Sequence, residues 1–199
     1  MAERREARRR LVLDAAIALF GRLGYHAATV PMIVAEAESS TGAFYLYFRN
    51  KEDVYAAALQ EIAERLAAAL NQVIERENTP YERMGAAVEG FVGWLAGHPA
   101  ESRMLMEAAT LGGRLEEAHR AVIESHVRSV AAALESAAHW IDAQDRGVVA
   151  RCWVGAILEV AMHWLRLEPG DRPDAARLAR TVRTFNLRGA GVAVPDSQE

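Results

Sequence analysis

The stretch that decides the fold is ATVPMIVAEAESSTGAFYLYFRNKEDV, residues 28–54. It contains two short runs of helix-compatible residues separated by a few polar ones. Thr29 is a good N-cap for the first run, and Pro31 falls within its first turn, where the missing N–H of proline costs little. Ser39 or Ser40 can cap the second run. The stretch therefore predicts two short helices joined by a tight turn.

The second of these helices has two different sides. Phe44 and Phe48 lie one turn apart, so they share a face that can pack on the preceding helices. The other side carries tyrosines and small polar residues, which can reach phosphates and base edges. A helix-turn-helix places such a helix in the major groove while the helix before it crosses the backbone. The expected DNA contacts are Arg4, Arg5, Thr29, Ser40, Thr41, Gly42, Ala43, Tyr45, Leu46, Tyr47 and Lys51.

The segment before this pair, residues 8–25, completes a three-helix unit. Its apolar residues recur at spacings of three and four, which favours an amphipathic helix. Gly24 supplies the stop. Five arginines crowd the first ten residues. They are either a basic arm beside the reading helix or a solvated charged end, and we favour the arm because it precedes a helix-turn-helix.

The same residues resemble the DNA-binding domain of the TetR family of bacterial transcriptional regulators. The matching positions are Leu19, Phe20, Gly24, Tyr25, Ala28 to Val30, Ser40, Gly42, Tyr45, Tyr47, Phe48 and Lys51. This resemblance covers roughly a quarter of the chain and is far more specific than a lone short motif. It implies an all-α protein that pairs through its last two long helices.

The chain departs from the family pattern in the turn, where Glu38-Ser39 replaces the usual Gly-Val. A position that needs positive φ costs a non-glycine residue on the order of 1–2 kcal/mol. Glu36 and Glu38 also bring negative charge near the expected phosphate path. We expect these changes to lower the affinity for DNA and to leave the fold intact.

Charge and composition fit a regulator only in part. Residues 1–53 hold eight Lys/Arg and seven Asp/Glu, whereas the whole chain of 199 residues has a net charge of −4. A basic footprint is the usual expectation for DNA binding, so the arm and the helix N-termini must supply the attraction. Cys152 is the one cysteine and allows no internal disulfide. We find no secretory signal and no apolar run near the ~18 residues of a membrane helix, so we expect a cytoplasmic protein with no membrane partner.

Beyond the reading unit the sequence is helical throughout. We expect a helix-turn-helix domain over 1–53 and a helical effector-binding and dimerisation domain over 54–199. The expected helices of the second domain span 54–77, 81–97, 99–111, 114–141, 145–167 and 173–189. Its tail, residues 189–199, should be frayed.

Two of these helices suggest a homodimer. The helix over 145–167 is apolar almost all the way round, so it must be buried both by its own core and by a partner subunit, or else be the central helix of a monomer. The expected interface residues are Val149, Trp153, Ala156, Val160, Trp164, Leu178, Val182 and Phe185. The family resemblance favours the dimer, and a two-fold dimer matches palindromic DNA.

A small-molecule pocket in the second domain has suggestive candidates. They are Phe91, Trp94, Met104, His119, Ile123, His126, Glu159 and His163. Aromatic residues and methionines more often fill a core, and the histidines are either satisfied core groups or polar anchors of an apolar pocket. Two histidines seven residues apart lack the partners of a metal site, so we expect no metal and no cofactor. The sequence contains no motif of an enzyme.

These features predict a DNA-binding transcriptional regulator, a repressor that an apolar or amphipathic effector releases from its operator. The alternative is a helical interaction protein that kept this fold and lost specific DNA binding. Glu36, Glu38 and the negative net charge motivate that alternative.

Overall fold

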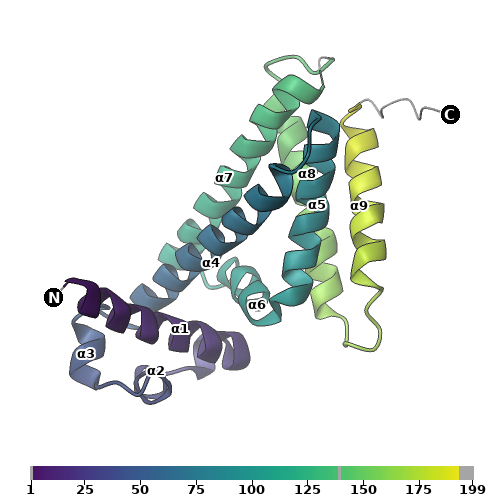
Figure 1. The fold of residues 1–199 in the computed structure, drawn as a ribbon. Coiled ribbons are helices and arrows are strands. Elements are labelled where there is room, and N and C mark those ends of the chain that lie inside the picture. Colours follow the sequence, from purple (N-terminus) through teal and green to yellow (C-terminus); the bar gives the residue numbers. More distant parts are fainter. Residues whose placement is uncertain (1, 139, 193–199) are drawn as a thin grey trace. The chain divides into compact units, whose positions relative to one another are not determined.

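The computed structural model describes residues 2–138 and 140–192. Within these ranges all regular secondary structure is helical, as the sequence predicts. The helices, labelled in Figure 1, are α1 (Ala2–Ala27), α2 (Val30–Glu36), α3 (Thr41–Tyr45), α4 (Lys51–Ile74), α5 (Pro80–Gly97), α6 (Pro99–Ala108), α7 (Gly113–Ala137), α8 (Arg146–Arg166) and α9 (Ala175–Gly189). Residues 193–199 of the expected frayed tail lie outside the described residues.

The helix ends follow local signals in the sequence. Gly24 interrupts α1 with φ 79°, a left-handed conformation that favours glycine, and this confirms the expected stop. The reading helix α3 is shorter than expected, because after Tyr45 the chain tightens into a turn. There the Tyr47 N–H donates to the Phe44 carbonyl at 3.0 Å. Helix α7 ends at Ala137 instead of continuing to Ile141.

The chain forms two compact units. Unit 1 joins the chain up to Glu64 with His98–Ala121, and unit 2 joins Arg65–Gly97 with the chain from Val122 onward. Helices α4 and α7 each begin in unit 1 and end in unit 2. These units differ from the division into residues 1–53 and 54–199, which stays a prediction about functional domains.

Unit 1 is built around the aromatic side of α1. Helix α1 packs against α2 and α6, and α2 packs against α3 (Figure 1). The largest side chains with no exposed surface here include Phe20, Ile33, Phe44, Tyr55 and Leu59. Burying each of them contributes roughly 1.5–3 kcal/mol. Because isolated helices as short as α2 and α3 are marginal in water, this packing holds them in place.

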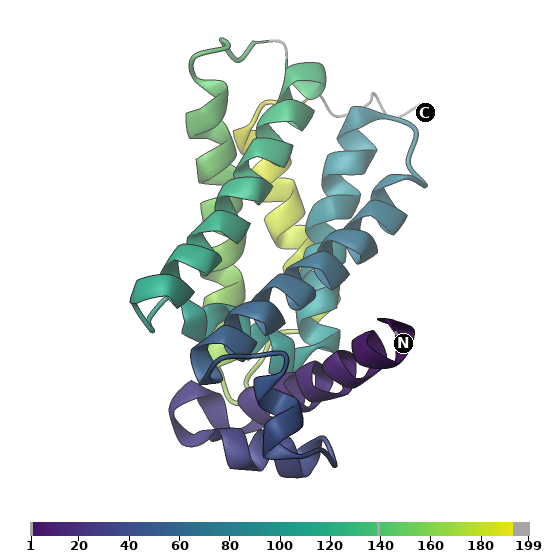
Figure 2. The ribbon, with the colours of Figure 1, turned by 90° about the vertical axis from the view of Figure 1, so that its left-hand side faces the viewer.

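Unit 2 is a helical bundle in which α5, α8 and α9 run side by side (Figures 1 and 2). Its core includes Val88, Leu134, Trp153 and Leu187. The buried Asn186 amide donates to the Trp153 carbonyl at 3.2 Å, so this polar group within the core is satisfied.

Helix α8 corrects one sequence expectation. Among the described residues it is long and apolar enough, by length and composition, to cross a membrane, with a mean hydropathy of 1.4 over its most apolar window. The expectation that no stretch of the chain has this character is therefore wrong. The core helix of a bundle needs the same composition, and Ala150, Trp153, Val154 and Ala161 of α8 are buried in unit 2.

Candidate nucleic-acid interface

Two side-chain caps define the helix-turn-helix locally. The Thr29 hydroxyl accepts the Met32 N–H at 3.4 Å, and the Ser40 hydroxyl accepts the Ala43 N–H at 3.1 Å. Each cap satisfies one of the N–H groups that a helix leaves unpaired at its N-terminus. The sequence prediction of a capped helix pair is confirmed, with Ser40 rather than Ser39 as the second cap.

The turn between α2 and α3 places Glu38 in the left-handed region, with φ 47°. The Ser39 N–H donates to the Val34 carbonyl and the Glu38 N–H donates to the Ala35 carbonyl, at 3.0 and 3.1 Å. This is the Schellman pattern, in which glycine usually occupies the position that Glu38 holds here. Glu38 is the only non-glycine residue with positive φ in the described part of the chain. The expected strain at this position is confirmed.

We therefore expect Glu38→Gly to stabilise the protein. The relief of strain, on the order of 1–2 kcal/mol, exceeds the entropic cost of glycine, which is about 0.5–1 kcal/mol. The free energy of unfolding should rise by about 0.5–1 kcal/mol in urea denaturation. Glu38→Gln is the matched control, because it removes the charge and keeps the strained side chain. A glycine variant no more stable than the glutamine variant would contradict this reading of the turn.

The inner side of the reading helix anchors it to unit 1. Phe44 has no exposed surface and Phe48 is buried, and their ring centroids lie 5.8 Å apart. The Arg9 guanidinium lies 5.5 Å from the centre of the Phe48 ring, so the base of α3 also contacts α1. The predicted packing face of Phe44 and Phe48 is confirmed.

The outer side of the reading helix and its C-terminal turn is free of other parts of unit 1. Tyr45 is 56% exposed and Leu46 69% exposed. Thr41 and Gly42 are exposed as well, and a Cβ added at Gly42 would meet no atom within 4 Å. Tyr45 and Leu46 are adjacent, and contiguous exposed apolar patches mark contact surfaces more often than scattered residues do, so this face is a candidate contact surface. Thr29 and Ser40 are exposed beside it, whereas Ala43 and Tyr47 are only partly exposed.

Unit 1 also carries exposed basic residues, and one of its acidic residues near the turn is paired. Arg4 and Arg5 lie exposed in the first turns of α1, so the predicted arm is helical from Ala2 onward. The Arg22 guanidinium pairs with the Glu36 carboxylate at 3.0 Å. The expected repulsion between Glu36 and phosphates is therefore partly offset.

Lys51 has a different surrounding from the one that the sequence suggested. Its ammonium donates to the backbone carbonyls of Tyr25, His26 and Ala28 at 2.9, 3.4 and 3.0 Å. These carbonyls lie at and just beyond the C-terminal end of α1, where helices leave acceptors unpaired. All three ammonium protons are thereby used. Lys51 therefore holds the end of α1, and its expected contact with a phosphate stays a prediction.

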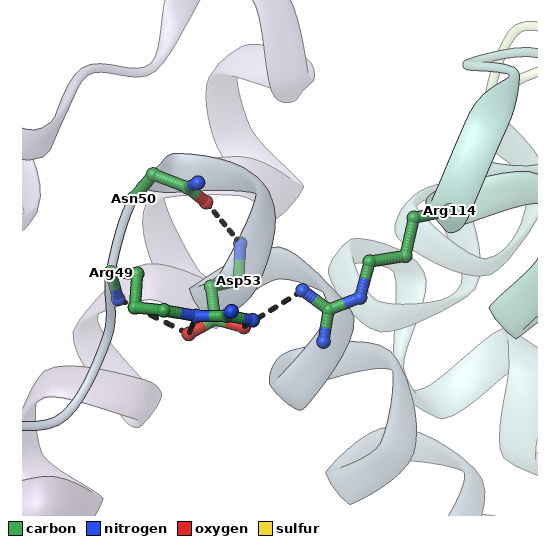
Figure 3. Close-up of polar contacts among 4 residues, drawn as sticks. All are labelled: Arg49, Asn50, Asp53 and Arg114. Carbon is green, nitrogen blue, oxygen red and sulfur yellow. Dashed lines mark hydrogen bonds and ion pairs between the residues drawn. The ribbon is translucent and has the colours of Figure 1, made fainter.

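A cluster of polar and charged residues at the start of α4 was not predicted from the sequence (Figure 3). The Asn50 side chain accepts the Asp53 N–H at 2.8 Å and so caps α4. The Asp53 carboxylate binds the Arg49 guanidinium at 3.0 Å and the Arg114 guanidinium of α7 at 2.9 Å. The Arg49 hydrogen bond is the largest of the effects that hold the pKa of Asp53 far below its usual value. Arg49 could have been noticed as a cation just after the reading helix, but nothing in the sequence points to Arg114.

Helix α6 holds the end of α1 in a second place. Both carboxylate oxygens of Glu107 accept the Tyr25 N–H, at 2.9 and 3.0 Å, and the Arg103 guanidinium donates to the Gly21 carbonyl at 2.9 Å. Burial, followed by the nearby Glu107 carboxylate, raises the pKa of Tyr55. The Tyr55 hydroxyl therefore stays protonated and donates to the Met104 carbonyl at 3.0 Å. No sequence signal indicates these pairings.

The expected effector residues are divided between the two units. Met104 and His119 belong to unit 1, where Met104 is fully buried and the His119 Nδ1 is buried with no hydrogen-bond partner. Burial lowers the pKa of His119, which favours the neutral ring. In unit 2, Trp94 is buried, Phe91, Ile123 and His126 are partly buried, and Glu159 and His163 are exposed on α8. The His126 Nδ1 lies 2.8 Å from the Val122 carbonyl, which fits a locally satisfied histidine.

The expected dimer residues also differ in their surroundings. Trp153 and Val182 are buried in the core of unit 2 and Trp164 is buried as well, and their assignment to a subunit interface stays a prediction. Val149, Ala156, Val160 and Leu178 are partly buried, and Phe185 is 67% exposed. The open side of α8 instead carries Val148, Cys152 and Gly155. A helix that is apolar on both sides does not reveal from sequence which side faces inward.

The N-terminal part of the chain is similar to a known family of regulators. Residues 12–58 match the family described as bacterial regulatory proteins of the tetR family. Over 83 residues, 42% of this chain, the sequence is 35% identical to the HTH-type transcriptional regulator HbdR of Aromatoleum sp. (strain CIB), and this segment spans 36% of that protein. The chain thus covers less than half of the length of the first curated relatives that it matches.

Similarity to solved structures extends over nearly the whole chain. A TetR-like transcriptional regulator from Rhodococcus sp. RHA1 is 26% identical, with a TM-score of 0.73, and the match covers 94% of this chain and 97% of that one. The regulator FadR from Bacillus subtilis, solved in complex with stearoyl-CoA, is 20% identical with a TM-score of 0.78. That match covers 90% of this chain and 97% of FadR, and it concerns the fold alone.

Proposed function

We propose that the chain is a DNA-binding transcriptional regulator of the TetR family, because residues 12–58 match the family described as bacterial regulatory proteins of the tetR family. It binds a palindromic operator as a homodimer and is released from it by a small effector. One observation carries the proposal: α3 and its C-terminal turn bury Phe44 and expose Tyr45 and Leu46 on the opposite side. A buried anchor on one side and an open face on the other is what a recognition helix in the major groove requires.

The operator is read by a small set of groups on this open face. Thr41 and the Tyr45 hydroxyl can bond phosphates or base edges, and Leu46 can contact thymine methyl groups. Gly42 allows the backbone of α3 to approach the duplex, since a side chain at this position would stand in open space. Arg4 and Arg5 add contacts of the kind that depend on salt.

The homodimer supplies the second reading helix that a palindrome needs. Unit 2 exposes the large apolar side chains of Val148 on α8 (62%) and Phe185 on α9 (67%). A groove of about 720 Å³ runs along α9 and is lined by Arg177, Arg180, Thr181, Thr184, Phe185, Arg188 and Gly189. Covering exposed apolar side chains such as these favours association of two copies.

The effector is an apolar or amphipathic molecule, and the protein acts in the cytoplasm, where such regulators meet DNA. Within unit 1, the candidate effector residue Met104 is apolar and buried, which fits this class. The FadR neighbour was solved with stearoyl-CoA, an amphipathic acyl thioester, which makes that compound the first probe to try. The His119 ring, kept neutral by burial, is a candidate polar anchor.

The test is a binding titration with a duplex that the wild-type dimer selects from a random-sequence pool. We expect salt-sensitive binding of one dimer per palindrome. Stearoyl-CoA should lower the affinity about 5–150-fold, the range that couplings of 1–3 kcal/mol produce. Binding that is absent, or equal for unrelated DNA, would contradict the proposal and favour an interaction protein without operator recognition.

A further inference from the structure

The Asp53 carboxylate has two cationic partners where one would neutralise it. Arg49 follows the turn that ends the reading helix, and Arg114 lies in the first turn of α7. Figure 3 shows the two guanidinium groups reaching the carboxylate from different sides. The cluster of Arg49, Asp53 and Arg114 therefore has a net charge of +1.

The two arginines differ in what holds them. The Arg49 side chain is 75% exposed, the Arg114 side chain 50%, and the Asp53 carboxylate only 17%. The carboxylate also accepts the backbone N–H of Arg49 at 3.1 Å, so the start of this loop is fixed while its guanidinium lies in water. Exposed ion pairs contribute little, typically about 0–1 kcal/mol. The Arg49 guanidinium donates to both Asp53 oxygens, at 3.4 and 3.0 Å, but it lies mostly in water, where a phosphate can replace the carboxylate.

Arg114 lowers the free-energy cost of moving the Arg49 guanidinium away from the Asp53 carboxylate. A largely buried carboxylate left without a cation is unfavourable. When the Arg49 guanidinium leaves, Asp53 retains the Arg114 ion pair at 2.9 Å and the Asn50 cap on its own N–H. The carboxylate thus stays paired in both positions of Arg49.

We propose that Arg49 exchanges the Asp53 carboxylate for a DNA backbone phosphate, and that Arg114 is a positioning residue that makes this exchange possible. The inference rests on the proposed function and extends it to a phosphate contact beyond the expected set. The Lys51 ammonium donates to three carbonyls, whereas the Arg49 side chain is 75% exposed, so Arg49 can reach a phosphate at this end of the reading helix. Arg114 then affects DNA binding without touching DNA.

A double-mutant cycle tests the exchange, using Arg49→Gln, Arg114→Gln and the double variant in the full-length dimer. The probes are the duplex selected by the wild-type dimer and an unrelated duplex, titrated across a salt series. Arg49→Gln should lower the affinity for both duplexes about tenfold. It should also reduce the log–log salt slope by about two, because two reading heads each lose one phosphate contact. Arg114→Gln should lower the affinity about threefold, and in the Arg49→Gln background it should have no further effect.

Arg120→Gln is the matched control, since Arg120 lies on the same helix and, in the part of the chain that the structure describes, forms an exposed ion pair with Glu116. Its affinity should stay within about twofold of the wild type, and thermal unfolding should show all four variants folded. An unchanged salt slope in Arg49→Gln would overturn the phosphate contact. Effects that multiply in the double variant would overturn the role of Arg114. Both results leave the proposed function standing, whereas a wild-type protein that binds neither duplex contradicts the proposed function itself.

Discussion

Phe44→Ala should lower the free energy of unfolding by about 3–5 kcal/mol, the range for removing a fully buried phenylalanine ring. Phe44 has no exposed surface, and its ring lies 5.3 Å from Tyr45 and 5.8 Å from Phe48 between centroids. Helix α3 has too few residues to persist without this anchor. Operator binding should therefore be lost together with the fold of the reading head. Urea denaturation followed by circular dichroism gives the change in stability.

Substitution of the adjacent residue, Tyr45, separates the loss of a packing anchor from the loss of a DNA contact. Tyr45→Ala removes a ring of similar size one position along the same helix, but Tyr45 is 56% exposed. Its stability should stay within about 0.5 kcal/mol of the wild type, as for most surface substitutions. Equal losses in the two variants would contradict the assignment of the inner and outer sides of α3.

Structural features that depend on neighbouring residues could be predicted from the sequence. Caps act over three residues, so Thr29 and Ser40 could be recognised from their neighbours. The break at Gly24 and the strain at Glu38 follow from the φ angles that a side chain permits. The spacing of Phe44 and Phe48 was sufficient to identify the face of α3 that packs inward.

Contacts between residues that are distant in the chain could not be predicted from the sequence. Lys51 bonds to carbonyls at the end of α1, and Arg114 reaches Asp53 from 61 positions away. The hydrogen bond from the Tyr25 N–H to the Glu107 carboxylate joins residues that are 82 positions apart. Periodicity also cannot choose between the two apolar sides of α8, so the sequence could not show that Trp153 packs in the core of unit 2.

The second prediction with a large expected effect concerns the affinity for DNA rather than the stability of the fold. Tyr45 presents both a ring and a hydroxyl on the open face, beside the exposed Leu46. Removing a side chain that contacts phosphate or base edges typically costs about 1–3 kcal/mol of binding free energy. Tyr45→Ala should therefore weaken binding to the selected duplex by roughly tenfold or more. Trp140→Ala is the control, because Trp140 is 60% exposed and lies in unit 2.

The measurement that tests the central claim most directly is the affinity of Tyr45→Ala for the selected duplex, set beside Trp140→Ala and wild type. The claim is that the open side of α3 and the turn that ends it contacts the operator. It predicts about a tenfold or larger loss for Tyr45→Ala, with wild-type stability and an intact dimer, and no loss for Trp140→Ala. Wild-type affinity in a folded Tyr45→Ala dimer would contradict it.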